Sequence, residues 1–357
     1  MRILITGICG FVGSALARSL RTLRPDTTIT GIDSLWRPGS ELNRSALRSE
    51  GFGVVHGDVR TASDLDALPP ADWVIDAAAN ASVLAGVDGQ TSGRQLVEHN
   101  LYGTVNILEY CRRHSAGLVL LSSSRVYSIR ALLEVPLEER DGAFHARAAD
   151  QPVRGYSPHG IAEGFSTDPP VSLYGASKLA SEQLALEYGA AFGFPVWIDR
   201  CGVLAGPGQF GQPAQGIFAY WINAWLRKRP LRYIGYGGTG VQVRDCLHPS
   251  DLARLVNAQL DAREPRPGAP AVVNVSGGVA GARSLAQLSS WCAERFGGRE
   301  IGREAATRAF DVPWVVLDCA RAATHWDWRP AIPPETIFEE IADHADRHPD
   351  WLERSGV

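Results

Sequence analysis

The sequence predicts an α/β protein in which a doubly wound parallel sheet is followed by a smaller, mixed α/β lobe. Two observations predict this fold: short apolar runs alternate with helical patterns over the first 200 residues, and a glycine-rich turn joins the first run to the first helix. Strict alternation of strand and helix makes the strands parallel and places helices on both faces of the sheet. We expect one lobe at residues 1–200 and a second at 201–357, with a segment at about 240–256 returning to the first lobe.

The first strand and helix flank the glycine-rich turn. RILIT, at residues 2–6, is a short apolar run typical of a buried strand, and FVGSALARSLRTL, at 11–23, has helical spacing. Gly7, Gly10 and Gly13 follow the pattern G-x-x-G-x-x-G. A plain tight turn would explain these glycines taken alone. The same geometry also lets the backbone approach a pyrophosphate, which the N–H groups and dipole of a helix N-terminus bind.

The next strands favour the pyrophosphate explanation. TTITGID ends in Asp33, about 20 residues past Gly13, where an acid binds a ribose diol in Rossmann-type folds. FGVVHGD ends in Asp58, which we expect near the adenine, and DWVIDAAA (72–79) and AGLVLLSSS (116–124) supply the fourth and fifth strands. A carboxylate at position 33 would repel a 2′-phosphate, so NAD fits better than NADP. Arg37 and Arg44 lie nearby and leave NADP open.

The candidate chemical centre combines a strand end with a helix. SLYGASKLASEQLALEYGAAF, at 172–192, is a helix on which Tyr174 and Lys178 are four residues apart and share one face. An ammonium beside a phenol favours the phenolate, which makes tyrosine a general base near neutral pH. Ser123, at the end of the fifth strand, would hold the same substrate hydroxyl.

Together these motifs resemble the extended short-chain dehydrogenase/reductase family, specifically its sugar-nucleotide epimerases and dehydratases. The matching stretches cover nearly the whole chain: GICGFVG, Asp33, GDVR, AAANASV, EHNLYGTVNILE, SSSRVY, YGASK, Gly206-Pro207 and VQVRDCLHPSDLA. The resemblance implies catalytic roles for Ser123, Tyr174 and Lys178. It implies NAD contacts at Gly7, Cys9, Gly10, Phe11, Val12, Gly13, Asp33, Asp58, Val59, Ala78, Asn100, Tyr174 and Lys178. It implies substrate contacts at Ser124, Arg125, Arg244 and Arg308, the last two with the diphosphate of a nucleotide sugar.

Three departures from the family patterns bear on the reaction. Ser124 and Arg125 stand where dehydratases of the family carry an Asp-Glu pair, so acid-assisted elimination is not expected. Val203 stands where UDP-sugar 4-epimerases usually carry Asn. The stretch GPGQFGQPAQGIFAYW (206–221) is similar to that of the CDP-hexose 2-epimerases, the CDP-tyvelose epimerase subgroup. In this stretch Gln209, Phe210 and Gln215 are candidate substrate contacts, whereas Phe218, Tyr220, Trp221 and Trp225 are expected in the core.

The leading interpretation is therefore an NAD-dependent epimerase that inverts a sugar hydroxyl carbon through a keto-sugar, with C2 of a CDP-hexose as the specific candidate. A UDP-sugar 4-epimerase, a nucleotide-sugar reductase or dehydrogenase, and a non-catalytic NAD(P)-binding regulator stay open as alternatives.

Composition sets the remaining expectations. A net charge of −4 gives no bulk positive field for nucleic acid, and no apolar stretch reaches the roughly 20 residues that span a bilayer. The six cysteines form no CxxC pair, so we expect neither disulfides nor a metal site, and a reducing cytoplasm. We expect a homodimer, a cap or partner contact from residues 128–172, and structural roles for Asp76 and His248.

Overall fold

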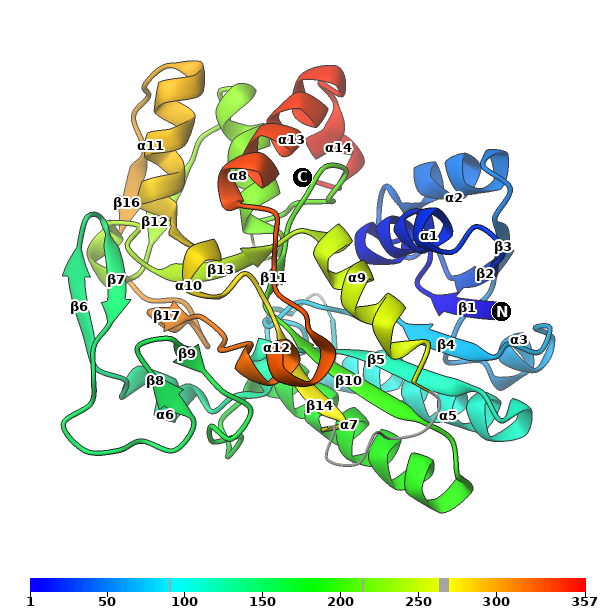
Figure 1. The fold of residues 1–357 in the computed structure, drawn as a ribbon. Helices are drawn as coiled ribbons and strands as arrows, with labels where there is room; N and C mark the ends of the chain where they lie inside the picture. Colours follow the sequence, from blue (N-terminus) through cyan, green and yellow to red (C-terminus); the bar gives the residue numbers. More distant parts are fainter. Residues whose placement is uncertain (90, 214, 263–269) are drawn as a thin grey trace.

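The computed structural model describes residues 1–89, 91–213, 215–262 and 270–357. Its centre is a seven-stranded parallel sheet in the order β14-β10-β5-β4-β1-β2-β3 (Figure 1). The strands are β1 (Arg2–Thr6), β2 (Thr28–Asp33), β3 (Gly53–His56), β4 (Trp73–Asp76), β5 (Gly117–Ser123), β10 (Val196–Cys201) and β14 (Val272–Val275). The predicted fold class and the first five strands are confirmed. The strand order reverses between β1 and β4, which places a ligand crevice at their carboxyl ends.

Helices cover both faces of the sheet (Figure 1). One face carries α1 (Phe11–Leu23), α2 (Ser40–Ser49), α9 (Pro249–Gln259) and α12 (Ala320–Trp326). The other face carries α3 (Ala62–Asp66), α4 (Gly93–Val97), the π-helical turn η1 (Glu98–Tyr102), α5 (Gly103–His114) and α7 (Ser172–Phe192). Because side chains alternate along a strand, every second residue belongs to each face. This alternation decides which polar residues meet which helix at the carboxyl edge.

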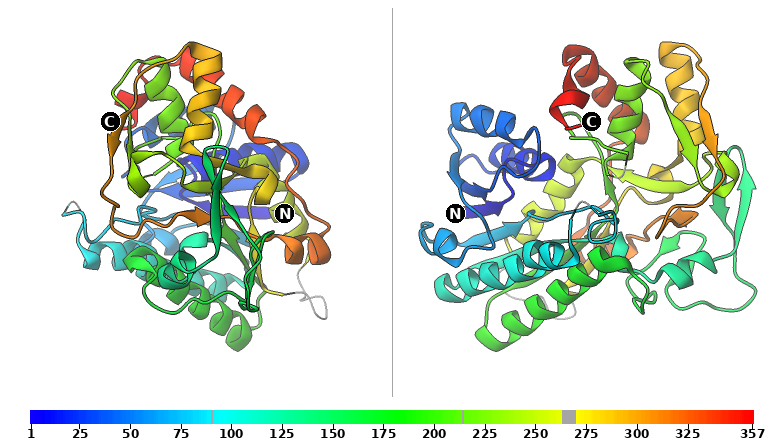
Figure 2. Two further views of the ribbon diagram at one scale, coloured as in Figure 1. Left: turned by 90° about the vertical axis from the view of Figure 1, so that its left-hand side faces the viewer. Right: turned by 180° about the vertical axis from the view of Figure 1, so that it is seen from behind.

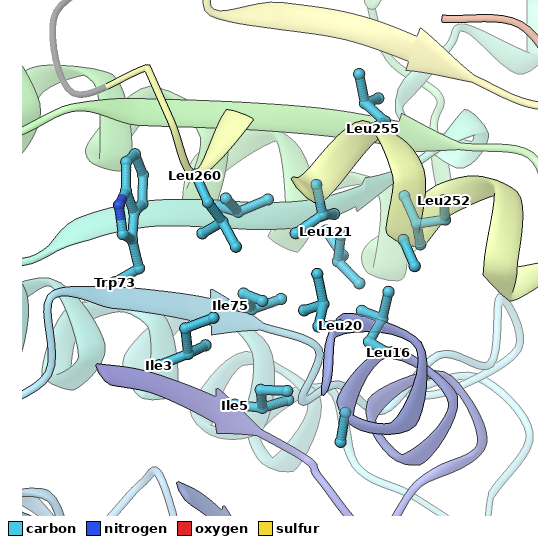
Figure 3. Packing of buried hydrophobic residues seen from close by; sticks show 14 of the residues in the cluster. Ile3, Ile5, Leu16, Leu20, Trp73, Ile75, Leu121, Leu252, Leu255 and Leu260 are labelled. Atoms are coloured by element: carbon cyan, nitrogen blue, oxygen red, sulfur yellow. The ribbon is translucent and has the colours of Figure 1, made fainter. Parts of the chain in front are cut away.

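The larger apolar core lies between the sheet and the helices α1 and α9 (Figure 3). Ile3, Ile5 and Ile75 from the strands pack against Leu16 and Leu20 from α1, and all are fully or almost fully buried. Burying such a side chain stabilises the fold by about 1.5–3 kcal/mol. This packing fixes α1 against β1, and with it the glycine turn that joins them.

The segment at about 240–256 returns to the first lobe as a helix, and the strand that returns there lies later in the sequence. Within 240–256, β13 (Val243–Leu247) belongs to a separate small sheet with β11 (Val203–Leu204), β15 (Ala282–Ser284) and β17 (Trp314–Val315). Only α9 returns from this segment, packing beside α1, and the returning strand is β14. The physical reason is that β14 pairs in parallel with β10, which requires a crossover connection, and α9 provides it.

The second lobe stands over the carboxyl ends of the strands (Figures 1 and 2). It contains α8 (Ile217–Leu226), β12 (Arg232–Ile234), η3 (Tyr236–Gly238), α10 (Gly278–Gly281), α11 (Leu285–Phe296), β16 (Gly302–Glu304), α13 (Pro334–Arg347) and α14 (Trp351–Arg354). Phe218, Trp221 and Trp225 are buried in its core, as predicted, whereas Tyr220 is half-buried.

The insert at 128–172 links the first lobe to the second through hydrogen bonds. It contains α6 (Ile129–Leu133), the hairpin β6 (Leu137–Arg140) and β7 (Ala143–Ala146), and the short pair β8 (Tyr156–Ser157) and β9 (Gly160–Ile161). The hairpin is tied to the second lobe where Ser284 Oγ donates to the Gly142 carbonyl at 2.7 Å and Phe144 N donates to the Val241 carbonyl at 3.0 Å. The expected contact with a partner stays a prediction.

Candidate functional site

One cavity of about 1050 Å³ runs along the carboxyl edge of the sheet, from the glycine turn to the second lobe. Most of the predicted site residues line it. They are Gly7, Gly10, Phe11, Val12, Gly13, Asp33, Asp58, Val59, Ala78, Ser123, Ser124, Arg125, Tyr174, Lys178, Gln209, Phe210, Gln215, Arg244 and Arg308. The fold thus brings residues from both lobes to one continuous space.

The glycine turn has the shape that a pyrophosphate requires. Gly7 adopts a φ of +65°, in the left-handed region that favours glycine. A Cβ on Gly13 would lie 2.2 Å from the Gly7 carbonyl oxygen, so only glycine lets α1 start this close to the turn. Gly10 is the N-cap of α1 and offers no side-chain cap, which leaves the first N–H groups of the helix for a ligand. The turn therefore fits a dinucleotide.

Asp33 organises the backbone at the next part of the cavity. Its Oδ2 accepts a hydrogen bond from Cys9 N at 2.8 Å and its Oδ1 accepts one from Leu35 N at 2.8 Å. Burial raises the pKa of Asp33, while these backbone bonds oppose the rise. Arg37 lies beside it, but its guanidinium donates to the Phe210 carbonyl at 2.5 Å. Arg37 therefore ties the turn after β2 to the second lobe.

The far end of the cavity carries an aromatic pair that sequence reasoning missed. Trp36 and His99 line it with their ring centroids 5.3 Å apart. Asp58 lies beside them and pairs with Arg60 at 2.6 Å. Burial favours the neutral form of Asp58, but the Arg60 guanidinium outweighs it and lowers the pKa of this carboxyl. No local pattern announces the Trp36–His99 contact, because the two residues come from distant segments.

Two of the predicted cofactor residues lie behind the cavity wall rather than on it. The Cys9 side chain is fully buried in the core, and its backbone N–H binds Asp33. Asn100, within the π-helical turn, is also buried; its amide accepts from Asn80 N at 2.8 Å and donates to the Asn80 carbonyl at 3.1 Å and to Ser177 Oγ at 3.1 Å. In this structure both residues shape the cavity through other groups.

The predicted chemical centre assembles where α7 meets the end of β5. Tyr174 and Lys178 are 6% and 3% exposed, and both line the cavity together with Ser123. A Cβ on Gly175 would lie 2.2 Å from the Arg125 carbonyl oxygen, so glycine permits this close approach of the helix. Ser123 Oγ accepts a hydrogen bond from Arg125 N at 3.1 Å, which orients the hydroxyl.

The scarcity of lysine is a signal that could have singled out Lys178. The sequence contains 33 arginines and only two lysines, Lys178 and Lys228. Lys228 is exposed, whereas Lys178 is buried beside the cavity. A chain that uses arginine for almost every cation has kept a compact ammonium at this one buried position, where a planar guanidinium is not equivalent.

The opposite end of the cavity is lined by three predicted arginines. Arg125 extends from the turn after Ser124, and burial together with the nearby Arg244 lowers its pKa to about 10. Arg244 donates to Asp311 Oδ1 at 2.9 Å and to the carbonyls of Val243 and Val312 at 2.7 and 2.9 Å.

Arg308 is exposed, and it contacts the carbonyl of Pro213 at 3.3 Å. Asp311 also lines the cavity. It could not be predicted as the partner of Arg244, because no local sequence pattern connects the two residues.

The three candidates from the 206–221 stretch line the cavity but hold internal partners. Gln209 donates to the Leu204 carbonyl at 2.8 Å, and Phe210 stacks on Trp351 with a centroid distance of 5.2 Å. Gln215 Oε1 accepts from Arg37 at 2.6 Å. These contacts hold the three side chains in place on the cavity wall, and their contact with a substrate stays a prediction.

The structure also gives the positions of His248 and Arg44. The imidazole of His248 caps α9 by accepting a hydrogen bond from Ser250 N at 3.2 Å, as expected. Arg44 is not among the described residues that line the cavity. A search of the described helices finds none with the length and apolar character needed to cross a bilayer.

Comparison with known proteins adds four findings. The chain is 27% identical to CDP-paratose 2-epimerase of Salmonella typhi, over 96% of this chain and 98% of the relative. It is 30% identical to a probable dTDP-glucose 4,6-dehydratase of Sinorhizobium fredii, over 75% of this chain and 69% of the relative.

Among solved structures, the UDP-glucose 4-epimerase of Thermus thermophilus in complex with NAD is 25% identical, with a TM-score of 0.74 over 98% of this chain and all of the other. Residues 3–276 match the model of the NAD dependent epimerase/dehydratase family. The chain therefore belongs to the NAD-dependent epimerase/dehydratase family, and its cofactor is NAD.

Proposed function

We propose that this enzyme is a sugar-nucleotide epimerase that keeps its NAD and inverts one hydroxyl-bearing carbon of the sugar. The observation that carries the proposal is the single cavity, which joins the glycine turn, the Ser123–Tyr174–Lys178 group and the arginines of the second lobe. A nucleotide sugar whose diphosphate lies near Arg244 and Arg308 would present its sugar to Tyr174.

Each residue of the site has a separate role in the proposed reaction. NAD, when bound, supplies the acceptor and donor of a hydride. Ser123 holds the reacting hydroxyl, and Tyr174 takes its proton as general base and later returns it. The Lys178 ammonium stabilises the phenolate that this transfer requires. Inversion further requires that the keto-sugar rotate inside the cavity, so that its carbonyl is reduced on the opposite face.

The specific candidate is C2 of a CDP-hexose. It is supported by the match with CDP-paratose 2-epimerase, which extends over nearly the full length of both chains at 27% identity. It is also supported by the resemblance of residues 206–221 to that subgroup. A UDP-sugar 4-epimerase is the alternative, and Val203, in place of the usual Asn, weighs against it.

The other reactions of the family need groups that this site lacks or uses differently. Dehydratases eliminate water with an Asp-Glu pair, and Ser124 and Arg125 occupy those positions on the cavity wall. A reductase would consume NAD(P)H and a dehydrogenase would consume NAD(P)+ at each turnover, so either would need added cofactor, whereas an epimerase regenerates its own. A regulator that only binds NAD would not need a buried tyrosine and lysine at one helix face.

Two measurements test the proposal. Mass spectrometry of the nucleotides released on denaturing the purified protein should find NAD at near-stoichiometric amount. The protein as isolated should then convert a CDP-hexose, or a UDP-hexose for the alternative, without added cofactor and without steady formation of NADH. A requirement for stoichiometric NAD(P)H would contradict the proposal.

We also propose that the enzyme is a cytoplasmic homodimer that pairs through α5 and α7, as the resemblance implies. Light scattering during size-exclusion chromatography measures the assembly directly, and a monomer at micromolar concentration would contradict it.

A further inference from the structure

The turn between β2 and α2, at residues 34–39, lies at the end of the cavity that contains the glycine turn. It follows Asp33 directly, and its residues Trp36 and Arg37 line the cavity. Asp33 in turn accepts a hydrogen bond from the backbone N–H of Cys9, within the glycine turn, at 2.8 Å. The β2–α2 turn therefore borders the part of the cavity that fits the dinucleotide.

The backbone of this turn is held in an uncommon conformation. Leu35 has a φ of +57° and Gly39 a φ of +90°, and a branched residue such as leucine is rarely found in the left-handed region. Local hydrogen bonds hold the conformation: Leu35 N donates to Asp33 Oδ1 at 2.8 Å, and Ser40 donates to the Arg37 carbonyl from N at 3.1 Å and from Oγ at 2.6 Å. Such backbone persists where the surrounding contacts fix it.

The side chain of Arg37 crosses from this turn to the second lobe. Its Nη1 donates to Gln215 Oε1 at 2.6 Å, and its Nη2 donates to the Phe210 carbonyl at 2.5 Å. Hydrogen bonds from an ionised donor are shorter and stronger than those between neutral groups. All three residues line the cavity, so this contact, which we call the Arg37 bridge, forms part of the cavity wall.

The second-lobe side of the bridge is itself anchored. The ring of Phe210 stacks on Trp351 of α14, whose Nε1 donates to the Gln209 carbonyl at 2.9 Å. A Cβ on Gly39 would lie 2.5 Å from the Phe210 ring and 3.0 Å from the Arg354 carbonyl oxygen, so the turn packs closely against both. The second lobe can therefore move away from this turn only if the Arg37 bridge breaks.

Trp36, the neighbour of Arg37, contacts a different wall of the cavity. Its indole ring lies 5.3 Å from the ring of His99, centroid to centroid, and both rings line the cavity. His99 belongs to η1, which packs on the opposite face of the sheet from α1 and α2. Two adjacent residues of one turn thus contact η1 and the second lobe, so the turn spans the cavity between them.

We propose that Arg37 retains NAD on this enzyme: its bridge to Phe210 and Gln215 closes the cavity beside Asp33 and the glycine turn, so that NAD leaves only when the two hydrogen bonds break. The inference deepens the proposed function and rests on it, because an epimerase of this kind keeps its cofactor through many turnovers. From the sequence alone, Arg37 leaves NADP open. A guanidinium that binds the second lobe is not available for a 2′-phosphate.

The exchange of bound NAD measures the bridge without any turnover. The wild type and Arg37→Met, as isolated with their NAD, are mixed with an excess of ¹³C-labelled NAD. Free cofactor is removed by rapid desalting at set times, and mass spectrometry gives the labelled fraction of the bound NAD. We expect exchange to be on the order of 10- to 100-fold faster in Arg37→Met, because two hydrogen bonds from a charged donor are lost.

Arg24→Met is the matched control. Arg24 donates from Nε to Asn257 Oδ1 at 2.6 Å and from Nη2 to the Asn257 carbonyl at 2.7 Å, so it uses the same two kinds of acceptor as Arg37. It also pairs with Asp261 at 2.6 Å. These contacts join the end of α1 to α9 within the first lobe, and Arg24 is not among the described residues that line the cavity. Arg24→Met should lower the urea midpoint and leave NAD exchange at the wild-type rate.

Gln215→Met removes one acceptor of the bridge and leaves Arg37 in place. It should accelerate exchange less than Arg37→Met does, because the Phe210 carbonyl still binds the guanidinium. The double variant should exchange no faster than Arg37→Met alone, because the Gln215 side chain acts on NAD through Arg37. Gln215→Met also replaces Arg37→Met if that variant does not fold.

Exchange at the wild-type rate in Arg37→Met, or equal acceleration in Arg24→Met, would overturn the Arg37 bridge as the device that retains NAD and leave the epimerase proposal intact. In a mixture of NAD and NADP, the bound ratio should be the same in the wild type and in Arg37→Met. A loss of NADP from the variant alone would show that Arg37 binds the 2′-phosphate, and would also overturn the proposal.

The proposed function can fail separately. Faster exchange in Arg37→Met, in a protein that epimerises no nucleotide sugar, would refute the epimerase and leave the bridge intact. A wild type that is isolated without NAD would refute both.

Discussion

Arg244 combines a structural contact with a proposed substrate contact, and Arg244→Met separates the two. Methionine keeps most of the apolar stem and removes a guanidinium that binds Asp311 and the carbonyls of Val243 and Val312. Breaking a buried ion pair costs about 3–5 kcal/mol. Because the two side chains are 14% and 18% exposed, water replaces part of the contact, and we expect a loss of roughly 2–4 kcal/mol in the free energy of unfolding.

Binding of the diphosphate would add a second, independent effect. Truncating one partner of a charge pair at a binding site costs about 2–5 kcal/mol, which corresponds to a rise of about 30- to 5000-fold in KM. Urea denaturation measures the stability of Arg244→Met, and initial rates with the NAD-loaded enzyme measure KM and kcat.

Arg283→Met is the matched control for this experiment. Arg283 faces Arg244 in the β13–β15 register and also pairs with a carboxylate, Glu335, but it does not line the cavity among the described residues. We expect it to leave KM unchanged. If Arg244→Met lost stability while KM stayed at the wild-type value, the arginine would be purely structural and the diphosphate assignment would be wrong.

Three further predictions follow from the site. Tyr174→Phe removes only the ionisable oxygen, so kcat should fall on the order of 10²–10⁴-fold with little change in the urea midpoint; retention of most activity would exclude Tyr174 as the base. Asp33→Ala should weaken NAD more than NADP in equilibrium dialysis and cost about 2 kcal/mol of stability, because the N–H groups of Cys9 and Leu35 lose their acceptor; equal weakening of both cofactors would contradict the ribose contact. Burial raises the pKa of Asp199 to about 7, so the folded state holds a proton that the unfolded chain releases near pH 4, and stability on the order of 4 kcal/mol is lost as pH rises from about 4 to 7. Asp199→Asn should therefore be more stable than the wild type at pH 8 but not at pH 4. If the difference between the urea midpoints of the two proteins stayed constant across this pH range, the predicted effect of Asp199 would be wrong.

Features that depend on neighbours in the sequence could be predicted well. The strand, glycine turn and helix at residues 2–23 follow from apolar periodicity and from the conformations that only glycine adopts. The placement of Tyr174 and Lys178 on one buried helix face follows from their spacing of four. The fold class follows from the alternation of strands and helices, because a parallel sheet needs a crossover between its strands.

Features that depend on contacts between distant segments could not be predicted. The Arg244–Asp311 ion pair joins residues that are 67 positions apart, and no local pattern links them. The return of β14 to the sheet depends on how α9 packs beside α1, and the motif at 240–256 does not reveal it. Asn100 belongs to the family motif EHNLYGTVNILE. In the fold, however, its side-chain amide binds the backbone of Asn80 and does not face the cavity.

The central claim is that the hydrogen removed from the inverted carbon returns to that carbon while NAD stays on the enzyme. The most direct measurement is turnover of a nucleotide hexose in deuterated water by the protein as isolated, with absorbance at 340 nm recorded and the product examined by NMR. We predict an epimer without solvent deuterium at the inverted carbon and without net NADH. Deuterium at that carbon would show deprotonation chemistry, steady accumulation of NADH would show a dehydrogenase, and either result would contradict the account.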